Sequence, residues 1–396
     1  MQKHDQDFIK RKNRTTVFEL IRKHSPVSRA EIARWTGMSP TTVSRIVNEL
    51  YHLDFMHEIE QETTSVGRKA VFLQVNPKSV LSVGVEMDKT GVRTGVVDLD
   101  GKVVGIRYIA RQPEEPSDAT LGKIADGIQT LIREGGFDRR RIVGIGVGLP
   151  GIIDHDGGRA VLSAQLGWKS TDIAPLLQER TGLPTAVDNE LKVKSLAEHT
   201  YGAAAGSKRS VLIGFGSGVG SSLIIDGDIY RGESNSAGEI GHTIVDPGGS
   251  LCECGKRGCL QTYIAEAALL EKARKIKPVS GLDELFQARR NGEGWAADIL
   301  DRAMAFIAVT IGNIACMYNP DTVILTGKLV EQYPEVKDFI AEKCMSEFVW
   351  EPLRGTFRIV YSAFEQDGVI IGSGLLAQSR FLDIASQIDQ MEQNQI

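Results

Sequence analysis

The sequence predicts an α/β protein in which a small helical domain with a β-wing precedes two α/β lobes of similar design. Two observations support this prediction: a basic N-terminal segment with closely spaced helix caps, and an order of strands and helices that occurs twice further along the chain. Glycine accounts for 42 of 396 residues, about 11% against a typical value of about 7%. These glycines form no repeat, which favours turns and ligand-binding loops.

Charge is distributed unevenly along the chain, although the net value is only −5. Residues 8–47 hold nine Lys or Arg against two Glu, a balance of +7, whereas residues 78–396 carry −8. A basic segment on an acidic body indicates that only the N-terminal part meets a polyanion.

Three helices are predicted in and around this basic segment. The first covers residues 15–24, and a Ser–Glu capping box opens the second at residues 28–36. After a turn at Gly37, Ser39 caps a third helix at residues 39–50. Short helices joined through glycine are typical of a helix-turn-helix.

The third helix and the segment after it carry candidate DNA contacts. Short hydroxyl and amide side chains with one Arg suit base edges and phosphates in a major groove. Predicted strands at 55–60 and 70–75 enclose a polar loop, as in a β-wing whose tip reaches a minor groove. The candidate residues are Ser39, Thr41, Thr42, Ser44, Arg45, Asn48, Arg68 and Lys69. A three-helix interaction module with a solvated basic face is the alternative.

The rest of the chain repeats one order of elements. Strand, turn and strand are followed by helix and strand over residues 81–147 and again over residues 210–326. Such a duplication predicts two mixed-sheet lobes with a ligand cleft between them. The predicted domains are a winged helix-turn-helix at 1–78, a first lobe at 79–190 joined by a C-terminal helix at 373–396, and a second lobe with an oligomerisation surface at 191–372.

The distribution of apolar residues and cysteines excludes a membrane-inserted protein and a disulfide-stabilised one. No window holds about 18 continuous apolar residues, and the N-terminus has no apolar run, so we expect a cytoplasmic protein without membrane insertion. Five cysteines, three of them within eight positions, do not suit a disulfide framework.

One histidine and three cysteines predict a metal site. His242, Cys252, Cys254 and Cys259 lie within 18 positions in a glycine-rich loop. Zinc prefers this ligand set, and four protein ligands leave no open position, so a structural ion is expected. Free buried thiols or a redox switch are the alternatives.

These motifs resemble the ROK (repressor, open reading frame, kinase) family. Glu239-Ile240-Gly241-His242 followed by Cys-x-Cys-Gly-x-x-Gly-Cys is similar to its signature, and the basic head with Gly67-Arg68-Lys69 resembles its NagC/XylR-type sugar-responsive repressors. The resemblance implies an actin-like, hexokinase-like (ribonuclease H-like) duplicated fold. It also implies a sugar site between the lobes.

Within the family, the residues favour the repressors over the kinases. The kinases carry Asp-x-Gly-Gly-Thr in the first hairpin, where this chain has Glu86-Met87-Asp88-Lys89-Thr90. Without those glycines a phosphate cannot approach closely, and Asp88 adds negative charge. Asn189-Glu190-Leu191-Lys192 stands where the kinases have Asn-Asp-x-Asn, so Glu190 replaces the catalytic Asp. We therefore expect no catalytic residue, although the loop at 216–220 stays kinase-like.

The resemblance implies five sugar-contacting residues: Asn189, Glu190, Glu239 and His242 match the family's positions, and Gln261 stands where many members have Glu, which changes an acceptor-only group to an amide. His242 can bind zinc through one ring nitrogen and donate to a sugar from the other. Salt-bridged loop carboxylates at 190 and 239 and a turn role for Asn189 are the alternatives. Lys192 would either neutralise Glu190 or shrink the site.

The predicted function is a sugar-responsive transcriptional repressor of carbohydrate uptake or catabolism genes. It would bind operator DNA as a homodimer or homotetramer and be released by a sugar or sugar-phosphate effector. A ROK sugar kinase with an added DNA-binding head, and a repressor sequestered by a protein regulator, are the alternatives. Xylose is one candidate effector beside glucose and N-acetylglucosamine, and the operator and regulated genes are left open.

Overall fold

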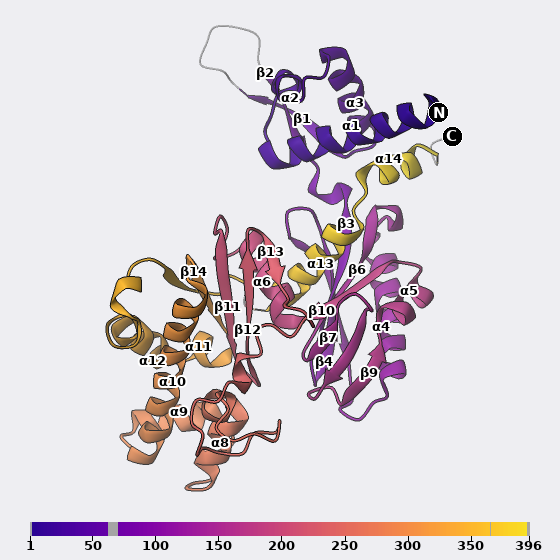
Figure 1. Ribbon diagram of the computed structural model, residues 1–396. Coiled ribbons are helices and arrows are strands. Elements are labelled where there is room, and N and C mark those ends of the chain that lie inside the picture. The colour runs from indigo at the N-terminus through magenta and orange to yellow at the C-terminus, as the bar shows by residue number, and fades with distance from the viewer. Residues whose placement is uncertain (1, 62–69, 365, 394–396) are drawn as a thin grey trace. The chain divides into compact units, whose positions relative to one another are not determined.

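The protein is described by a computed structural model that covers residues 2–61, 70–364 and 366–393 (Figure 1). The chain divides into two compact units. Unit 1 comprises Met1–Val147, Ile173–Ala186 and Ser373–Ile396, and unit 2 comprises Gly148–Asp172 and Val187–Gly372. The three-domain division expected from the sequence stays a prediction.

Unit 1 begins with three helices and a two-stranded antiparallel sheet, in the predicted order. The elements are α1 (Gln2–His24), α2 (Arg29–Thr36), α3 (Pro40–His52), β1 (Met56–Gln61) and β2 (Ala70–Val75). The Ser28–Glu31 capping box opens α2, and the Ser39 hydroxyl caps α3 by accepting from the Thr42 amide at 3.1 Å. Arg68 and Lys69 lie outside the described residues.

The first helix is longer than predicted. It starts at Gln2 rather than near residue 15, because its polar N-terminal half has no apolar period to signal it. Partners from the far end of the chain hold that half. Arg11, for example, bonds Asp383 at 2.9 Å.

The larger part of unit 1 is built on a sheet with the strand order β10-β6-β3-β4-β5. Its strands are β3 (Leu81–Met87), β4 (Gly91–Val97), β5 (Val103–Ala110), β6 (Ile142–Leu149) and β10 (Thr185–Asn189). Helix α4 (Ser117–Glu134) contacts β4, β5 and α5 (Ala174–Thr181).

The predicted C-terminal helix at 373–396 is instead two helices, α13 (Gly368–Phe381) and α14 (Ile384–Gln393). The break has a local cause, because Asp383 accepts bonds from the Ser386 amide at 3.1 Å and the Ser386 hydroxyl at 2.7 Å. An Asp that caps in this way starts a new helix. Ile384 and Ile388 of α14 then join the core formed by α1 and α3.

Unit 2 repeats the sheet of unit 1, as the duplicated sequence pattern predicts. Its order is β13-β12-β11-β14-β15, so each strand has a counterpart at the same position of the first sheet. The strands are β11 (Arg209–Phe215), β12 (Val219–Ile225), β13 (Asp228–Tyr230), β14 (Thr322–Thr326) and β15 (Arg358–Tyr361). Strands β12 and β14 flank β11, antiparallel and parallel to it respectively.

Helices make up most of the rest of unit 2. They are α6 (Glu190–Thr200), α7 (Gln261–Ile264), α8 (Glu266–Arg274), α9 (Leu282–Arg290), α10 (Gly294–Tyr318), α11 (Lys328–Gln332), α12 (Pro334–Phe339) and a π-helical segment (Ile340–Phe348). A small sheet of β7 (Ile152–Asp154), β8 (Arg159–Ser163) and β9 (Trp168–Asp172) completes it. The sequence pattern does not predict α9 or this sheet.

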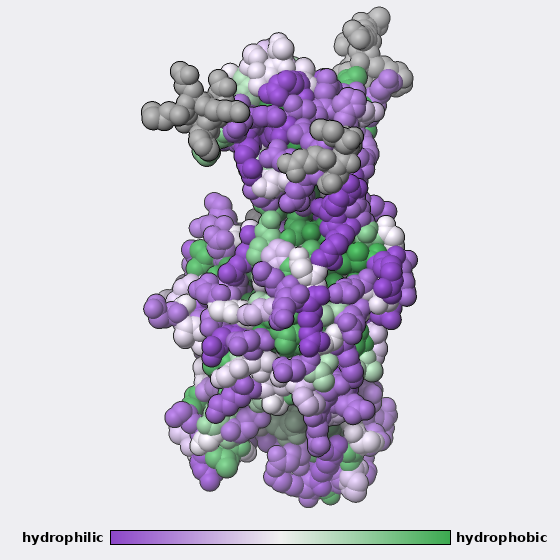
Figure 2. Space-filling view, turned by 90° about the vertical axis from the view of Figure 1, so that its right-hand side faces the viewer, coloured by the Kyte–Doolittle hydropathy of each residue, from purple (hydrophilic) through white to green (hydrophobic). Residues whose placement is uncertain are grey.

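Among the described residues, α10 is the one helix long and apolar enough to cross a membrane. Its apolar side chains, such as Ile307 and Ile311, are fully buried in the core of unit 2. A core helix has this composition. Hydrophilic residues predominate on the face shown in Figure 2, with apolar ones in small groups among them.

A close contact within unit 1 gives a test of this packing. A Cβ atom on Gly146 would lie 1.8 Å from the carbonyl oxygen of Ser373 in α13. We expect Gly146→Ala to lower the free energy of unfolding by about 1–3 kcal/mol, measured by chemical denaturation. Gly294→Ala is the control, because a Cβ atom at that position would have no neighbouring atom within 4 Å. Equal stability of the Gly146 variant and the wild type would contradict the packing.

Candidate functional site

Unit 2 contains a cavity of about 450 Å³, a size that suits a small ligand. The start of α6, the turn between β11 and β12, and the loop before α7 form its walls. All five residues that the sequence predicts to contact a sugar line it: Asn189, Glu190, Glu239, His242 and Gln261. Their convergence is a fact of the structure, and their contact with a sugar stays a prediction.

Asn189 uses its side chain to build the cavity wall. Its Oδ1 caps α6 by accepting from the Leu191 amide at 2.9 Å, and its Nδ2 donates to the Gly151 carbonyl at 3.0 Å. The turn role considered for this residue is therefore present. The cap also places Glu190 at the first position of α6, where it lines the cavity.

Lys192 anchors the loop that carries Glu239. Its side chain is buried, and its Nζ donates to the Asn235 carbonyl. Burial lowers the pKa of Lys192, and the nearby charges of Asp188 and Glu239 oppose that shift. The Lys192 side chain lines the cavity and so narrows it, and its bond to Asn235 holds the loop that carries Glu239.

Asp188, which is not among the residues predicted from the sequence, is the second residue that anchors the loop carrying Glu239. Its carboxylate is fully buried, and it accepts from Arg231 at 2.5 Å and from the Asn235 amide at 3.1 Å. A buried carboxylate needs such partners. Its position near the end of the apolar strand β10 could have marked Asp188 as a candidate site residue. Its partners Arg231 and Asn235 lie more than 40 residues away, so the sequence did not indicate the contacts.

The four predicted metal ligands form a cluster. The ligand atoms of His242, Cys252, Cys254 and Cys259 all lie within 4.8 Å of one another. Cys252 Sγ is 3.7 Å from His242 Nδ1, and Cys254 Sγ is 3.6 Å from Cys259 Sγ. All three thiols are free, so the donors could converge on one metal ion.

The glycine-rich loop makes this convergence possible. At Gly258 φ is +72°, and a Cβ would lie 1.6 Å from the Asp246 carbonyl oxygen. The bridges Ile244–Cys259 and Leu251–Arg257 close the loop on itself. Only glycine fits at position 258.

Two cluster thiols differ in acidity. A backbone hydrogen bond from Lys256 is the main cause that lowers the pKa of Cys254 to about 7, with further bonds from neighbouring ligands. Burial, together with the adjacent thiols, raises the pKa of Cys259 to about 12.

Gln261 faces the cluster as well as the cavity. Its Nε2 donates to Cys252 Sγ at 3.3 Å and to the Glu253 carboxylate at 3.0 Å. The predicted sugar contact of Gln261 would therefore have to share an amide that already has protein partners.

In the first hairpin of unit 1, the Asp88 carboxylate accepts hydrogen bonds from its own turn. Asp88 Oδ1 accepts from the Thr90 amide at 2.6 Å and from the Gly91 amide at 2.9 Å. These are backbone N–H groups of the kind that a phosphate-binding turn offers to its ligand. Glu86 pairs with Arg93 at 2.9 Å across the same hairpin.

The six predicted DNA contacts among the described residues lie at the N-cap and on the outer side of α3. Ser39, Thr41, Arg45 and Asn48 are exposed, and Thr42 and Ser44 are partly exposed. Val43, Ile46, Val47 and Leu50, on the opposite side, are fully buried. Asn48 Oδ1 also accepts from Arg29 at 3.1 Å, and Arg45 bonds Glu49 at 2.7 Å.

A model of the ROK family matches residues 82–380. The chain belongs to the ROK family. The family and the α/β fold predicted from the sequence are thereby confirmed.

Repressors are among its most similar relatives. The xylose repressor of Bacillus subtilis strain 168 is 30% identical over 381 residues, which span 96% of this chain and 98% of that protein. The DNA-binding transcriptional dual regulator NagC of Escherichia coli K12 is 25% identical over 394 residues, 96% of each chain.

Solved structures show the same fold. A ROK family transcriptional regulator, a homologue of the E. coli MLC protein, has a TM-score of 0.79 at 24% identity and covers 96% of this chain and 99% of its own. A ROK hexokinase from Thermus thermophilus has a TM-score of 0.68 at 24% identity and covers 76% of this chain and 99% of its own. The fold is thus found both in a transcriptional regulator and in a hexokinase.

The thiol acidities predict an order of reaction in metal-free protein. Cys254 is exposed, and its lowered pKa favours the thiolate, which is the reactive form. Burial raises the pKa of Cys344 to about 11. We expect iodoacetamide to label Cys254 well before Cys344 in chelator-treated protein, as followed by peptide mass spectrometry. Labelling in the reverse order would contradict the loop geometry.

Proposed function

We propose that this protein is a sugar-responsive transcriptional repressor of carbohydrate genes. The observation that carries the proposal is the extent of the similarity to named repressors, which spans 96% of this chain, whereas the ROK hexokinase spans 76%. The family domain itself begins at residue 82, after the three helices and the two-stranded sheet. The repressor relatives therefore share a segment that a kinase does not need.

The N-terminal segment is proposed to be a winged helix-turn-helix that places α3 in a major groove. Its exposed face carries Thr41, Arg45 and Asn48, which can bond to base edges and phosphates. A homodimer would present two such helices to a near-palindromic operator. A cytoplasmic location follows from this role.

The cavity of unit 2 is proposed to bind the sugar effector. Glu190 and Glu239 supply carboxylate acceptors for hydroxyl groups, and His242 supplies a ring nitrogen that can donate. The names of the Bacillus relatives favour xylose as the first sugar to test. Binding would favour one arrangement of the protein and lower its affinity for the operator.

The cluster beside the cavity is proposed to hold a structural zinc ion. The three thiols and the imidazole fit that ion in type and number. The ion would fix His242 in the cavity wall through its Nδ1, which faces Cys252.

A sugar kinase is the rival function, because ROK kinases share the fold and the loop Gly216–Gly218 lines the cavity. The bonds of Asp88 to its own turn weigh against it, since they use the N–H groups of the first hairpin. ADP release above background from ATP and a panel of hexoses and xylose would favour the kinase.

A selection experiment tests the DNA-binding proposal. We expect the full chain to enrich near-palindromic duplexes from a random library, with half-sites about one helical turn apart. Arg45→Ala should weaken binding to the enriched duplex by about 5- to 150-fold, whereas Arg133→Ala, on the exposed face of α4, should not. Failure of the wild type to enrich any sequence would overturn the proposal.

Metal analysis tests the zinc proposal. Purified wild-type protein should contain one zinc ion per chain, and Cys254→Ser should lose it and unfold at a lower temperature, because metal binding contributes to folding. Cys316→Ser is the matched control, since Cys316 is exposed and lies outside the cluster. A wild-type protein without zinc, or loss of zinc from both variants, would contradict the assignment.

A further inference from the structure

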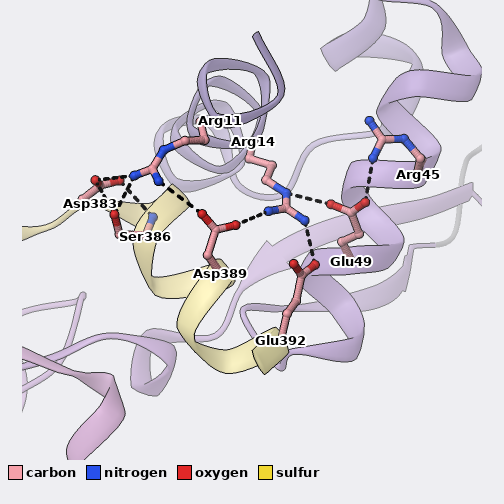
Figure 3. Close-up of polar contacts among 8 residues, drawn as sticks. All are labelled: Arg11, Arg14, Arg45, Glu49, Asp383, Ser386, Asp389 and Glu392. Atoms are coloured by element: carbon pink, nitrogen blue, oxygen red, sulfur yellow. Dashed lines mark hydrogen bonds and ion pairs between the residues drawn. The ribbon is translucent and has the colours of Figure 1, made fainter. Parts of the chain in front are cut away.

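A buried guanidinium joins α1, α3 and the C-terminal helix α14. The Arg14 side chain is only 1% exposed, and each of its three nitrogens bonds a different carboxylate (Figure 3). Nε bonds Glu49 at 2.9 Å, Nη1 bonds Asp389 at 2.7 Å and Nη2 bonds Glu392 at 2.6 Å. A buried cation is tolerated only when its donors are paired, so this arrangement leaves little freedom to any of the four side chains.

Glu49 extends this arrangement to the outer side of α3. One of its oxygens accepts from the buried Arg14, and the other accepts from Arg45 Nη1 at 2.7 Å. Figure 3 shows the carboxylate between the two guanidinium groups. Arg45 itself is 51% exposed. An exposed ion pair one helical turn apart is usually weak because two flexible side chains must be ordered together, but here Arg14 already orders one of them.

Helix α14 contacts the N-terminal helices through both apolar packing and ion pairs. Its apolar residues, including Ile384, Ile388 and Met391, are buried in the same core as the inner face of α3. Its acidic residue Asp389 accepts from both Arg11, at 3.2 Å, and Arg14. The acidic side chains of α14 therefore have a fixed position from which to orient Arg14.

We propose that Glu49 is a positioning residue for DNA binding, because it holds Arg45 in the orientation in which Arg45 contacts DNA. Arg14 holds Glu49, and Asp389 and Glu392, the acidic side of α14, hold Arg14. The inference rests on the proposed DNA-binding function. The bond to Glu49 engages one nitrogen of Arg45, and the other nitrogens keep donors for a two-point contact with a guanine or a phosphate. An ordered arginine loses less freedom on binding than a mobile one.

The alternative is that the negative charge of Glu49 weakens DNA binding. A carboxylate on a DNA-facing helix repels phosphates and neutralises a nearby arginine, so charge alone predicts that its removal strengthens binding to every sequence. Both oxygens of Glu49 are already bonded, one to Arg14 and the other to Arg45, which favours positioning over repulsion. The two accounts predict changes of opposite sign.

Fluorescence anisotropy with the full chain separates them. The probes are the duplex enriched from the random library and a scrambled duplex of the same composition. We expect Glu49→Gln to weaken binding to the enriched duplex by about 2- to 12-fold, the cost of ordering one long side chain, without weakening binding to the scrambled one. In an Arg45→Ala background, Glu49→Gln should cause no further loss, because Glu49 acts through Arg45.

A second variant changes α14 and leaves α3 intact. Asp389→Asn with Glu392→Gln removes two of the three carboxylates around Arg14, and we expect a loss in the same direction that also disappears in the Arg45→Ala background. Glu271→Gln is the matched control and should bind as the wild type does, because its helical ion pair with Lys275, at 2.7 Å, lies in unit 2. The unfolding midpoint of each variant shows that it is folded.

Two results would overturn the positioning role. One is binding of Glu49→Gln to the enriched duplex as tightly as the wild type or more tightly. The other is an equal loss with and without Arg45, which would give Glu49 a structural role only. A wild type that does not prefer the enriched duplex over the scrambled one would instead overturn DNA binding itself.

Discussion

The candidate site depends on how one long loop is held. Thirty residues separate the end of β13 at Tyr230 from the start of α7 at Gln261, and they carry Glu239 and all four residues of the cluster. Backbone hydrogen bonds, such as those from the Val245 and Asp246 amides to the Gly258 carbonyl, fold this loop on itself, and side chains tie it to the rest of unit 2. Asp188 and Lys192 fix its first part, and the cluster ligands with Gly258 shape its second part.

This dependence explains why the cavity and the cluster occur together. The loop residue Glu239 reaches the cavity because its own loop is anchored to β10 and α6, where Asn189 and Glu190 already lie. His242 belongs to both sites, so an ion in the cluster would also set the cavity wall. In unit 1, Asp88 bonds two backbone amides of the first hairpin turn, and this supports the proposed repressor over a kinase.

Local pattern was enough to predict much of the fold and of the site. Caps at Ser28 and Ser39 placed α2 and α3, because a capping side chain bonds within three residues of itself. The cysteine spacing predicted the cluster, because all four ligands lie in one loop. The duplicated strand order predicted two sheets with matching topology.

What the sequence missed depends on contacts between distant residues. Arg14 and Asp389 are 375 positions apart, and neither belongs to an apolar period that would point to burial. The same holds for Lys192. The sequence suggested a contact with Glu190, and it gave no sign of the bond that Lys192 donates to the Asn235 carbonyl. Long-range polar pairs leave no periodic signal, so only the structure identifies them.

The central claim is that a sugar in the cavity of unit 2 lowers affinity for DNA, and linkage tests it most directly. The affinity of the full chain for the enriched duplex is measured with and without D-xylose, D-glucose, N-acetylglucosamine and N-acetylglucosamine 6-phosphate, and the affinity for each sugar with and without DNA. We expect that one sugar weakens DNA binding, that DNA weakens binding of that sugar by the same factor, and that Glu239→Gln abolishes both effects. Tight DNA binding that no sugar changes would contradict the claim.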